Sequence, residues 1–301
     1  MEKDHPSHPG VFSIKGLKRL LPLSLPKRIY RFSAHIPPIR MLANALIRSR
    51  IPNSLKIEEG EILLDKSDVA VSGSLALGIF EKEEVDLFRK SLRPGMTVID
   101  IGANIGLYTI IAGKRVGPTG KVFSFEPEKD IYNRLNKNIE HNQLKNVTTN
   151  QVALDNISGT RTLYLDKDNK GHNSFSNDKS AYKELKVTTE TLDQSLQKYD
   201  SPVVDIIKMD IEGAEPLALE GMQETLKRSP NVVIFTEIFP DAIRRLGKNP
   251  LTFLKSLSNL NKSIWVINED TTNLKLLKEK DFESFLKGLG KDDFANLCVS
   301  N

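Results

Sequence analysis

The sequence predicts a doubly wound α/β fold: a mostly parallel sheet of seven strands, with helices on both faces and an antiparallel C-terminal edge. From Gly95 onward, short apolar runs of strand length alternate with helical patterns, which is typical of a parallel sheet. Residues 98–106, VIDIGANIG, have the pattern of a buried strand, a glycine turn and the start of a helix. The chain of 301 residues is long enough for one large core and a smaller appended part.

The expected strands are apolar runs bounded by turn residues, and the last two form the antiparallel edge. They lie at 97–101, 121–125, 147–154, 203–209, 232–236, 264–267 and 295–299. The expected helices carry apolar residues at helical spacing, and they lie at 81–92, 105–115, 128–142, 216–227, 241–246 and 252–257. Two more strand-like pieces, 161–165 and 185–189, flank a polar loop, and residues 57–80 suggest short strands and turns.

The net charge of +4 is unevenly distributed. Residues 1–50 contain ten Lys or Arg and two acidic residues, a net charge of +8, which leaves −4 for the rest. Such a basic, partly amphipathic arm can contact an anionic membrane surface or an anionic substrate, and equally can be a solvated leader or helices packed on the main domain. We therefore expect a basic extension at 1–56, strands and a helix at 57–94, and a catalytic domain at 95–301.

The cellular location follows from what the sequence lacks. It has no run of 18 apolar residues, and its proline-containing start has no apolar signal region. Cys298 is the single cysteine, which excludes an internal disulfide and a thiolate zinc cluster. These features predict a cytoplasmic protein, with peripheral membrane contact possible through the basic arm. They do not indicate an oligomeric state.

The glycine turn after the first expected strand predicts a nucleotide site. Gly102 lets the backbone approach a ligand, Gly106 lets the helix start against the strand, and Glu126 follows 24 residues after Gly102, where a carboxylate can accept both ribose hydroxyls. A dinucleotide fingerprint requires a second glycine where Asn104 stands, and Asp100 at the turn disfavours a pyrophosphate. A cationic sulfonium nucleoside, S-adenosylmethionine, fits better.

Three segments carry a family resemblance. GMTVIDIGANIGLYT (95–109), VFSFEPEKDIYNRLNKNIEHN (122–142) and IIKMDIEGAE (206–215) resemble the FkbM family of S-adenosylmethionine-dependent methyltransferases. The similarity runs from about residue 60 to 237 and includes ETLDQSL (190–196). The resemblance implies a class I, Rossmann-like methyltransferase fold and mainly O-methylation of hydroxyls on sugars, polyketides and related products. The basic arm lies outside it.

The cofactor residues are expected at the turns after the first four strands. They are Asp100, Gly102, Ala103, Asn104, Gly106, Thr109, Glu126, Pro127, Val152 and Asp210. The family-like fold would bring Gln151, Val152 or Asp155 to the adenine, and the sequence does not decide among them. Tyr108 is expected to serve packing.

Methyl transfer to a hydroxyl requires alignment of the acceptor and removal of its proton. Asp210, which ends the fourth strand, is the first candidate for this role, and Glu212 and Glu237 are further candidates. Glu215 is interpreted as a carboxylate at the start of the next helix, where the helix dipole favours a negative charge. His172 is an alternative base in the loop 166–180, where Asn173 and Ser174 are candidates for substrate contacts.

A metal is considered and not favoured. Asp210, Glu212 and Glu237 could converge as hard oxygen ligands for Mg²⁺. The preferred interpretation is that these carboxylates bind substrate hydroxyls or Lys208 without a metal.

Other functions remain as alternatives. A nucleic-acid or protein methyltransferase is one, although the acidic main domain and K-M-D-I-E-G in place of an (N/D)-P-P-(Y/F) tetrad oppose nucleic acid as a partner. A cofactor-binding scaffold without catalysis and an NAD-dependent dehydrogenase are less favoured. The leading hypothesis is O-methylation of a hydroxyl on a sugar, glycolipid or secondary metabolite.

Overall fold

The structure is a computed structural model that describes residues 37–166, 173–176, 181–268, 274–290 and 293–301. The chain divides into two compact units, residues 1–47 and 48–301. Helix α2 (Pro37–Arg50) is the described element that begins in the first unit. The elements below all belong to the second unit, and the predicted boundaries at residues 57 and 95 stay a prediction.

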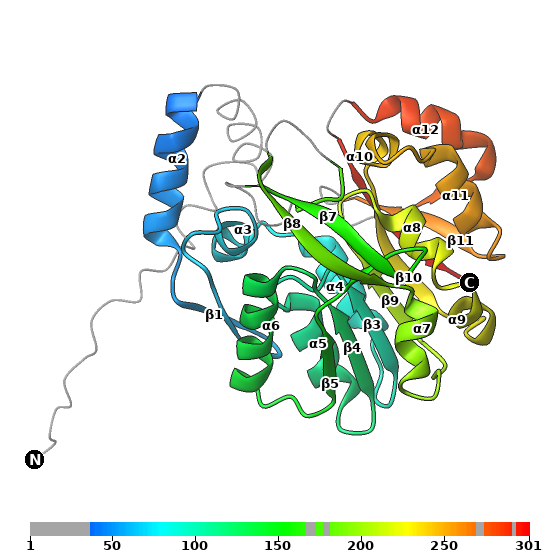
Figure 1. Ribbon diagram of the computed structural model, residues 1–301, viewed down its shortest axis with the longest axis horizontal. Helices are drawn as coiled ribbons and strands as arrows, with labels where there is room; N and C mark the ends of the chain where they lie inside the picture. The colour runs from blue at the N-terminus through cyan, green and yellow to red at the C-terminus, as the bar shows by residue number, and fades with distance from the viewer. Residues whose placement is uncertain (1–36, 167–172, 177–180, 269–273, 291–292) are drawn as a thin grey trace, which may run out of the picture. The chain divides into compact units, whose positions relative to one another are not determined.

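An eight-stranded sheet forms the centre of the second unit (Figure 1). Its strands are β3 (Thr97–Ile101), β4 (Lys121–Phe125), β5 (Val147–Asn150), β9 (Ile206–Met209), β10 (Val233–Ile238), β11 (Ser263–Ile267), β12 (Leu274–Leu277) and β13 (Ala295–Ser300). Their spatial order is β12-β11-β13-β10-β9-β3-β4-β5. Most of these strands are short apolar runs that are buried on both faces, as parallel strands between two layers of helices are.

The direction of winding reverses between β3 and β9. From β3 the chain proceeds outward through β4 to β5, then returns to β9 and continues to β10, and all these neighbours are parallel. Strand β13 is antiparallel to both β10 and β11. The predicted doubly wound fold with an antiparallel C-terminal edge is confirmed, and ligands bind at such a reversal point.

The predicted count of seven strands is wrong by one. Strand β12 pairs antiparallel with β11 and forms an edge of the sheet. Its residues Leu274 and Leu276 are exposed, so the segment lacks the buried apolar run that identified the other strands. An edge strand of four residues leaves little signal in the sequence.

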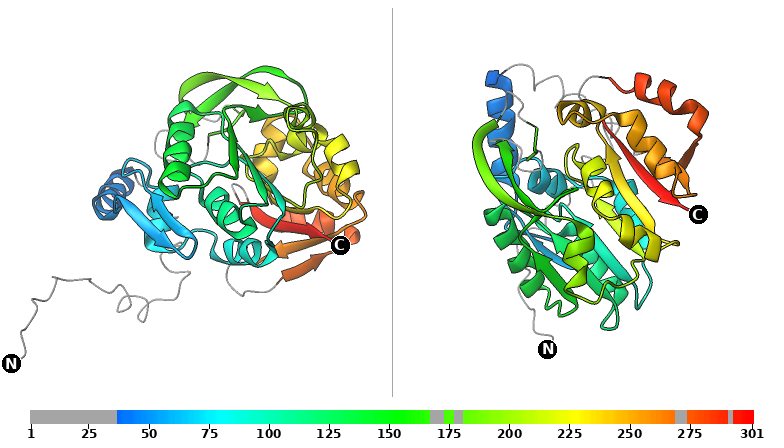
Figure 2. Two further views of the ribbon diagram at one scale, coloured as in Figure 1. Left: turned by 90° about the horizontal axis from the view of Figure 1, so that it is seen from below. Right: turned by 45° about the vertical axis from the view of Figure 1, so that its right-hand side comes forward.

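Helices cover the sheet in two groups. Helices α4 (Lys82–Ser91) and α6 (Lys129–His141) contact α5 (Leu107–Val116), which packs on β3 and β4. The second group shares one apolar core with the sheet, and Figure 2 shows its C-terminal members beside β11 and β13. It consists of α7 (Leu192–Gln197), α8 (Glu215–Glu220), α9 (Gln223–Arg228), α10 (Pro240–Arg245), α11 (Pro250–Ser258) and α12 (Phe282–Gly288).

A separate three-stranded sheet lies beyond the carboxyl end of β5. It contains β6 (Ala153–Leu154), β7 (Gly159–Asp166) and β8 (Ala181–Glu190). The strand predicted at 147–154 is therefore divided, because its last residues leave the main sheet and pair in parallel with β8. Leu163, Leu165 and Val187 of the hairpin bury a small apolar cluster with Ala153.

Two other predicted elements differ. The helix expected at 216–227 is two helices, α8 and α9, separated at Gly221, where an added Cβ would lie 2.1 Å from the Asp155 carbonyl oxygen. Short strands are confirmed near the start of residues 57–80, where β2 (Gly60–Leu63) pairs with β1 (Ser54–Ile57), although β1 begins three residues before the expected segment; Val71–Leu77, expected as strands and turns, is helix α3. Helix α3 ends at Gly78, which adopts the left-handed conformation and donates its backbone N–H to the carbonyl oxygens of Leu75 and Ser74.

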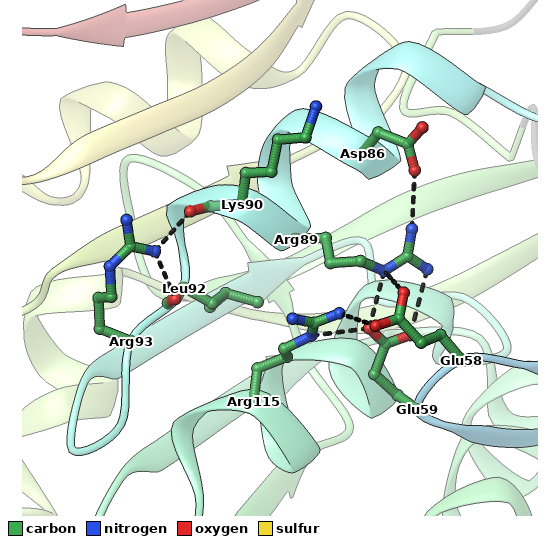
Figure 3. Close-up of polar contacts among 8 residues, drawn as sticks. All are labelled: Glu58, Glu59, Asp86, Arg89, Lys90, Leu92, Arg93 and Arg115. Atoms are coloured by element: carbon green, nitrogen blue, oxygen red, sulfur yellow. Dashed lines mark hydrogen bonds and ion pairs between the residues drawn. The ribbon is translucent and has the colours of Figure 1, made fainter.

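An ion-pair network joins the β1–β2 turn to two helices (Figure 3). Arg89 of α4 donates to both carboxylate oxygens of Glu59, at 2.7 and 3.1 Å, and Arg115 of α5 donates to the same group at 2.8 Å. Burial alone would raise the pKa of Glu59, but the two guanidinium groups together hold it below its usual value. The network fixes the turn against the helices that support β3.

No helix in the described part of the chain has both the length and the apolar character needed to cross a bilayer.

Candidate active site

A pocket opens at the carboxyl ends of β3, β4 and β9, where the direction of winding reverses. It contains about 600 Å³ of space, part of it open to solvent. Its floor and walls are lined by Ile101, Gly102, Asn104, Phe125, Glu126, Pro127, Ile131, Val152, Asp210, Ile211, Glu212 and Ala214. The sheet of β6, β7 and β8, with the segment between β7 and β8, adds Ala153, Leu154, Leu163, Asn173 and Phe175.

Glu126 presents a buried carboxylate to this pocket directly after β4. Its Oε1 accepts the backbone N–H of Glu128 at 2.9 Å, and its Oε2 accepts that of Asn104 at 3.1 Å. Burial raises the pKa of Glu126 to about 7, although these two N–H donors oppose the shift. Each carboxylate oxygen has a second lone pair, so a pair of ligand hydroxyls can bind to the same group.

Gly102 is required by the close approach of two strand ends. Its φ is +79°, and a Cβ there would lie 2.0 Å from the backbone oxygen of Asp210. Gly106, at φ +97°, caps α5 and would meet the Leu135 side chain of α6 at 2.7 Å. The glycines predicted to admit a ligand therefore also permit the turn to pack against β9 and α6.

Four of the predicted cofactor residues lie below or behind the pocket lining. Asp100 is buried and its Oδ2 accepts the Thr109 hydroxyl at 2.5 Å, while the Thr109 oxygen also lies 2.8 Å from the Ser124 hydroxyl. Burial raises the pKa of Asp100 to about 6. Ala103 and Gly106 form the turn without lining the pocket. The other six, namely Gly102, Asn104, Glu126, Pro127, Val152 and Asp210, line it.

The expected adenine partners are separated by the bend after β5. Gln151 is exposed, whereas Val152 lines the pocket. Asp155 is buried and forms an ion pair with Arg161, whose guanidinium lies over the Phe175 ring. Val152 is therefore the member of this group that the structure brings to the pocket.

The predicted catalytic carboxylates gather at the ends of β9 and β10. Asp210 and Glu212 line the pocket, and Asp210 has a side chain that is 28% exposed. Glu237 lies behind them on β10 and is buried. Burial, together with neighbouring carboxylates, raises the pKa of Glu212 and of Glu237 well above the usual value.

A buried lysine lies beneath Asp210. The Lys208 Nζ atom is 3.2 Å from Oε1 of Glu84 and 3.8 Å from Oδ2 of Asp210. It also lies 4.9 Å from the centre of the Tyr108 ring, and the Tyr108 hydroxyl is 3.0 Å from Oε2 of Glu81. Burial alone would lower the pKa of Lys208, but the three surrounding carboxylates hold it above its usual range. Tyr108 is thus part of a polar network as well as the packing expected of it.

The described part of the polar loop 166–180, residues 173–176, reaches the pocket. The Ser174 hydroxyl donates to the backbone oxygen of Glu212 at 2.9 Å, and Asn173 and Phe175 line the pocket. Asn173 also accepts the Asp166 N–H with its side-chain oxygen, at 3.2 Å. The predicted alternative base, His172, lies outside the described residues.

The sequence interpretation missed Glu81 and Glu84. Glu81 directly precedes α4, and Glu84 is the first buried residue of that helix. Glu84 is four residues before Phe88, so the two share one face of the helix, and both are buried. The sequence signal that could have identified Glu84 is an acidic residue at the helical spacing of the buried apolar positions. Burial raises the pKa of Glu81 to about 8.

Comparison with known proteins finds similarity to methyltransferases. A model of the methyltransferase FkbM domain matches residues 100–261, more than half of the chain. Methyltransferase sdnD of Sordaria araneosa is 28% identical over 162 residues, which cover 42% of this chain and 60% of that protein. Hexuronic acid methyltransferase AglP of Haloferax volcanii is 26% identical over 193 residues, or 63% of this chain and 74% of that protein.

Among solved structures, methyltransferase FkbM from Methylobacillus flagellatus superimposes with a TM-score of 0.41 at 15% identity, covering 90% of this chain and 62% of that one. The chain spans 60% of the length of sdnD, so similarity to that relative concerns only part of it.

Proposed function

Because the chain belongs to the FkbM family of S-adenosylmethionine-dependent methyltransferases, we propose that it methylates a hydroxyl group of a sugar, glycolipid or secondary metabolite. The observation that carries the proposal is the placement of the half-buried Asp210 in the same pocket as the diol-binding carboxylate Glu126. One carboxylate is positioned to hold a nucleoside, and the other lies where an acceptor can reach it.

The residues of the pocket fit S-adenosylmethionine. Glu126 retains acceptor capacity for the two ribose hydroxyls, and apolar side chains such as Phe125, Ile131 and Val152 suit a flat adenine ring. When bound, the cofactor supplies a methyl group activated by its positive sulfonium. The partly exposed carboxylate of Asp210, which lines the same pocket, favours a cationic ligand.

Asp210 is the residue that we assign to the acceptor hydroxyl. Its partly exposed carboxylate can accept the hydrogen bond of an alcohol and take up its proton. The Nζ atom of Lys208 lies 3.8 Å from Oδ2 of Asp210, and the Ser174 contact to the Glu212 backbone holds residues 173–176 over the same end of the pocket. Glu212 and Glu237 are secondary candidates for receiving the proton.

A small acceptor suits this pocket better than a nucleic acid. The described residues that line the pocket include no lysine or arginine, so the phosphate groups of a polyanion find no cationic partner there. A sugar acceptor is further supported by the relative AglP, whose name gives hexuronic acid as its substrate. The basic residues of positions 1–50 add the proposal that the acceptor, or the surface to which it is attached, is anionic.

The proposal is tested by a methyl-transfer assay with labelled S-adenosylmethionine against fractionated glycans, lipids and small metabolites. We expect label in a product that survives mild alkali, because methyl ethers are stable there and methyl esters are hydrolysed. Label that is released by alkali would replace the hydroxyl acceptor with a carboxylate. Absence of both transfer and S-adenosylhomocysteine binding would contradict the proposed function.

Asp210→Asn tests the placement of the acceptor. We expect it to lower turnover by about 10²–10⁴-fold, as loss of a general base does, while affinity for S-adenosylhomocysteine changes little. Glu224→Gln, on the exposed surface of α9, removes a carboxylate remote from the pocket and serves as the control. Full activity of Asp210→Asn would show that the acceptor binds elsewhere.

A further inference from the structure

Three carboxylates meet behind the pocket at the edge of the sheet. Asp210 follows β9, Glu215 begins α8, and Glu237 lies on β10. One oxygen of each lies within 4.8 Å of the others. The carboxyl ends of adjacent parallel strands bring these residues together, although 27 positions separate the first from the last.

Two oxygen atoms in this group are buried without a donor. Glu237 is 5% exposed, and its Oε2 has no hydrogen-bond partner among the described residues. Oε2 of the fully buried Glu215 is in the same state, while its Oε1 accepts the N–H of Ile211 at 2.9 Å. Burial of a carboxylate oxygen without a donor is costly, so both atoms indicate a ligand that supplies positive charge.

Asn296 adds a neutral oxygen to the same region. It lies directly opposite Glu237 in the β10–β13 pairing, and paired residues project from the same face of a sheet. Its Oδ1 is also buried and without a partner among the described residues. An environment of carboxylate and amide oxygens is the one preferred by Mg²⁺ and Mn²⁺.

Lys208 does not supply the positive charge for this group. Its Nζ pairs with Glu84 and, at 3.8 Å, with Oδ2 of Asp210. Among the ion pairs of the described residues, none joins Lys208 to Glu215 or Glu237. Within the part of the chain that the structure describes, no lysine or arginine forms an ion pair with Glu215 or Glu237.

The spacing agrees with a shared ion. Oxygens bound to one Mg²⁺ at about 2.1 Å lie at most about 4.2 Å apart, and those bound to one Ca²⁺ at about 2.5 Å lie at most about 5 Å apart, so oxygens within 4.8 Å of one another need only a small adjustment to share the smaller ion. We propose that Asp210, Glu215 and Glu237 bind one divalent cation, Mg²⁺ or Mn²⁺, through one oxygen each. Glu215, whose position in the first turn of a helix suggested only a dipole effect, has a second oxygen available for this role. With Glu215 as a third ligand, we propose a metal site here in place of the metal-free interpretation preferred from the sequence.

The cation has a place in the proposed function, and this part of the inference rests on that function. Asp210 lines the pocket, so an ion bound to it lies where an acceptor hydroxyl could enter its coordination shell. A divalent cation lowers the pKa of a bound hydroxyl and so assists loss of its proton. Binding of the ion itself does not depend on the reaction.

The experiment is a titration of the full chain with Mn²⁺, without S-adenosylmethionine, followed by the loss of the free-ion electron paramagnetic resonance signal. We expect one Mn²⁺ per chain, displaced by Mg²⁺. Glu237→Gln should weaken Mn²⁺ binding by at least about tenfold, whereas the control Glu224→Gln should bind as the wild type does. Circular dichroism verifies that each variant is folded.

Failure to bind Mn²⁺, or equal binding by wild type and Glu237→Gln, would overturn the proposal. If Glu237→Gln does not fold, Asp210→Asn replaces it, because its partly exposed side chain tolerates the change, and the same tenfold loss is required. A separate titration with S-adenosylhomocysteine distinguishes the metal site from the proposed function. If S-adenosylhomocysteine binds and Mn²⁺ does not, only the proposed metal site is contradicted. If Mn²⁺ binds and S-adenosylhomocysteine does not, only the proposed function is contradicted.

Discussion

The Nζ atom of Lys208 lies 3.2 Å from Oε1 of Glu84, and the two side chains are 1% and 0% exposed. Lys208 belongs to the central strand β9 and Glu84 to the helix α4, so the pair joins the sheet to the segment that precedes it. The Tyr108 hydroxyl lies 3.3 Å from the other oxygen of Glu84. The pair is a buried charge pair supported by a hydrogen bond, beneath the candidate catalytic Asp210.

Lys208→Met is expected to destabilise the protein by about 3–5 kcal/mol, because it leaves the buried Glu84 without its cation. The double variant Lys208→Met/Glu84→Gln should recover a large part of the loss, since the uncompensated charge is then removed as well. Urea denaturation of the two single variants and the double variant measures this coupling. A loss below about 1 kcal/mol for Lys208→Met would show that the pair contributes little.

Gly102→Ala is expected to destabilise the protein by more than the about 1–2 kcal/mol of a left-handed backbone alone, because the new Cβ collides with the Asp210 carbonyl. Gly247→Ala is the control, since Gly247 has a φ of +73° and an added Cβ there meets no atom within 4 Å. Denaturation curves of both variants separate the clash from the backbone cost. Equal losses would contradict the proposed role of the close approach.

Glu126→Gln is expected to weaken S-adenosylhomocysteine binding by about 10- to 100-fold, because a charged acceptor for two hydroxyls is replaced by a neutral amide. Glu140→Gln, an exposed position on α6, should bind as the wild type does. Isothermal titration calorimetry measures both affinities. An unchanged affinity in Glu126→Gln would place the ribose elsewhere.

The same affinity should depend on pH. Burial raises the pKa of Glu126 to about 7 in the free protein, and hydroxyl donors bind better to the ionised carboxylate than to the neutral acid. Affinity for S-adenosylhomocysteine should therefore increase as the pH rises from 6 to 8. Glu126→Gln should reduce this dependence, and an equally steep dependence in that variant would assign it to another group.

Glu59→Gln tests the network of Figure 3. Arg89 and Arg115 hold the pKa of Glu59 below the usual 4.5 against the effect of burial. The carboxylate therefore stabilises the fold above that pH, and the contribution is lost as the pH falls through the lowered pKa. We expect Glu59→Gln to cost about 1–3 kcal/mol at pH 7, since both arginines are partly exposed.

The difference between wild type and Glu59→Gln should decrease as the pH is lowered from 7 to 3. Urea denaturation at both pH values measures it. A difference that stays constant or grows on acidification would contradict the sign of the effect.

Local sequence patterns determined the main strands, the glycine turn and the position of Glu126 after β4. Apolar runs of strand length are determined by burial on both faces, and Gly102 and Gly106 are determined by backbone conformations that other residues adopt at a cost. These constraints act within a few neighbouring residues, so the amino-acid sequence alone reveals them. The position of Asp210 directly after β9 made it the first candidate for the acceptor site, and that role stays a prediction.

Only the tertiary structure decided which distant groups meet. It separated β6 from β5, divided α8 from α9 where Gly221 meets Asp155, and placed Asp100 under the turn with Thr109 instead of in the pocket lining. It also brought Glu215 and Glu237 together and placed Glu84 beside Lys208. These contacts depend on strand order and on which face of a helix is buried. A sequence specifies such contacts only through the fold as a whole, because their partners are remote along the chain.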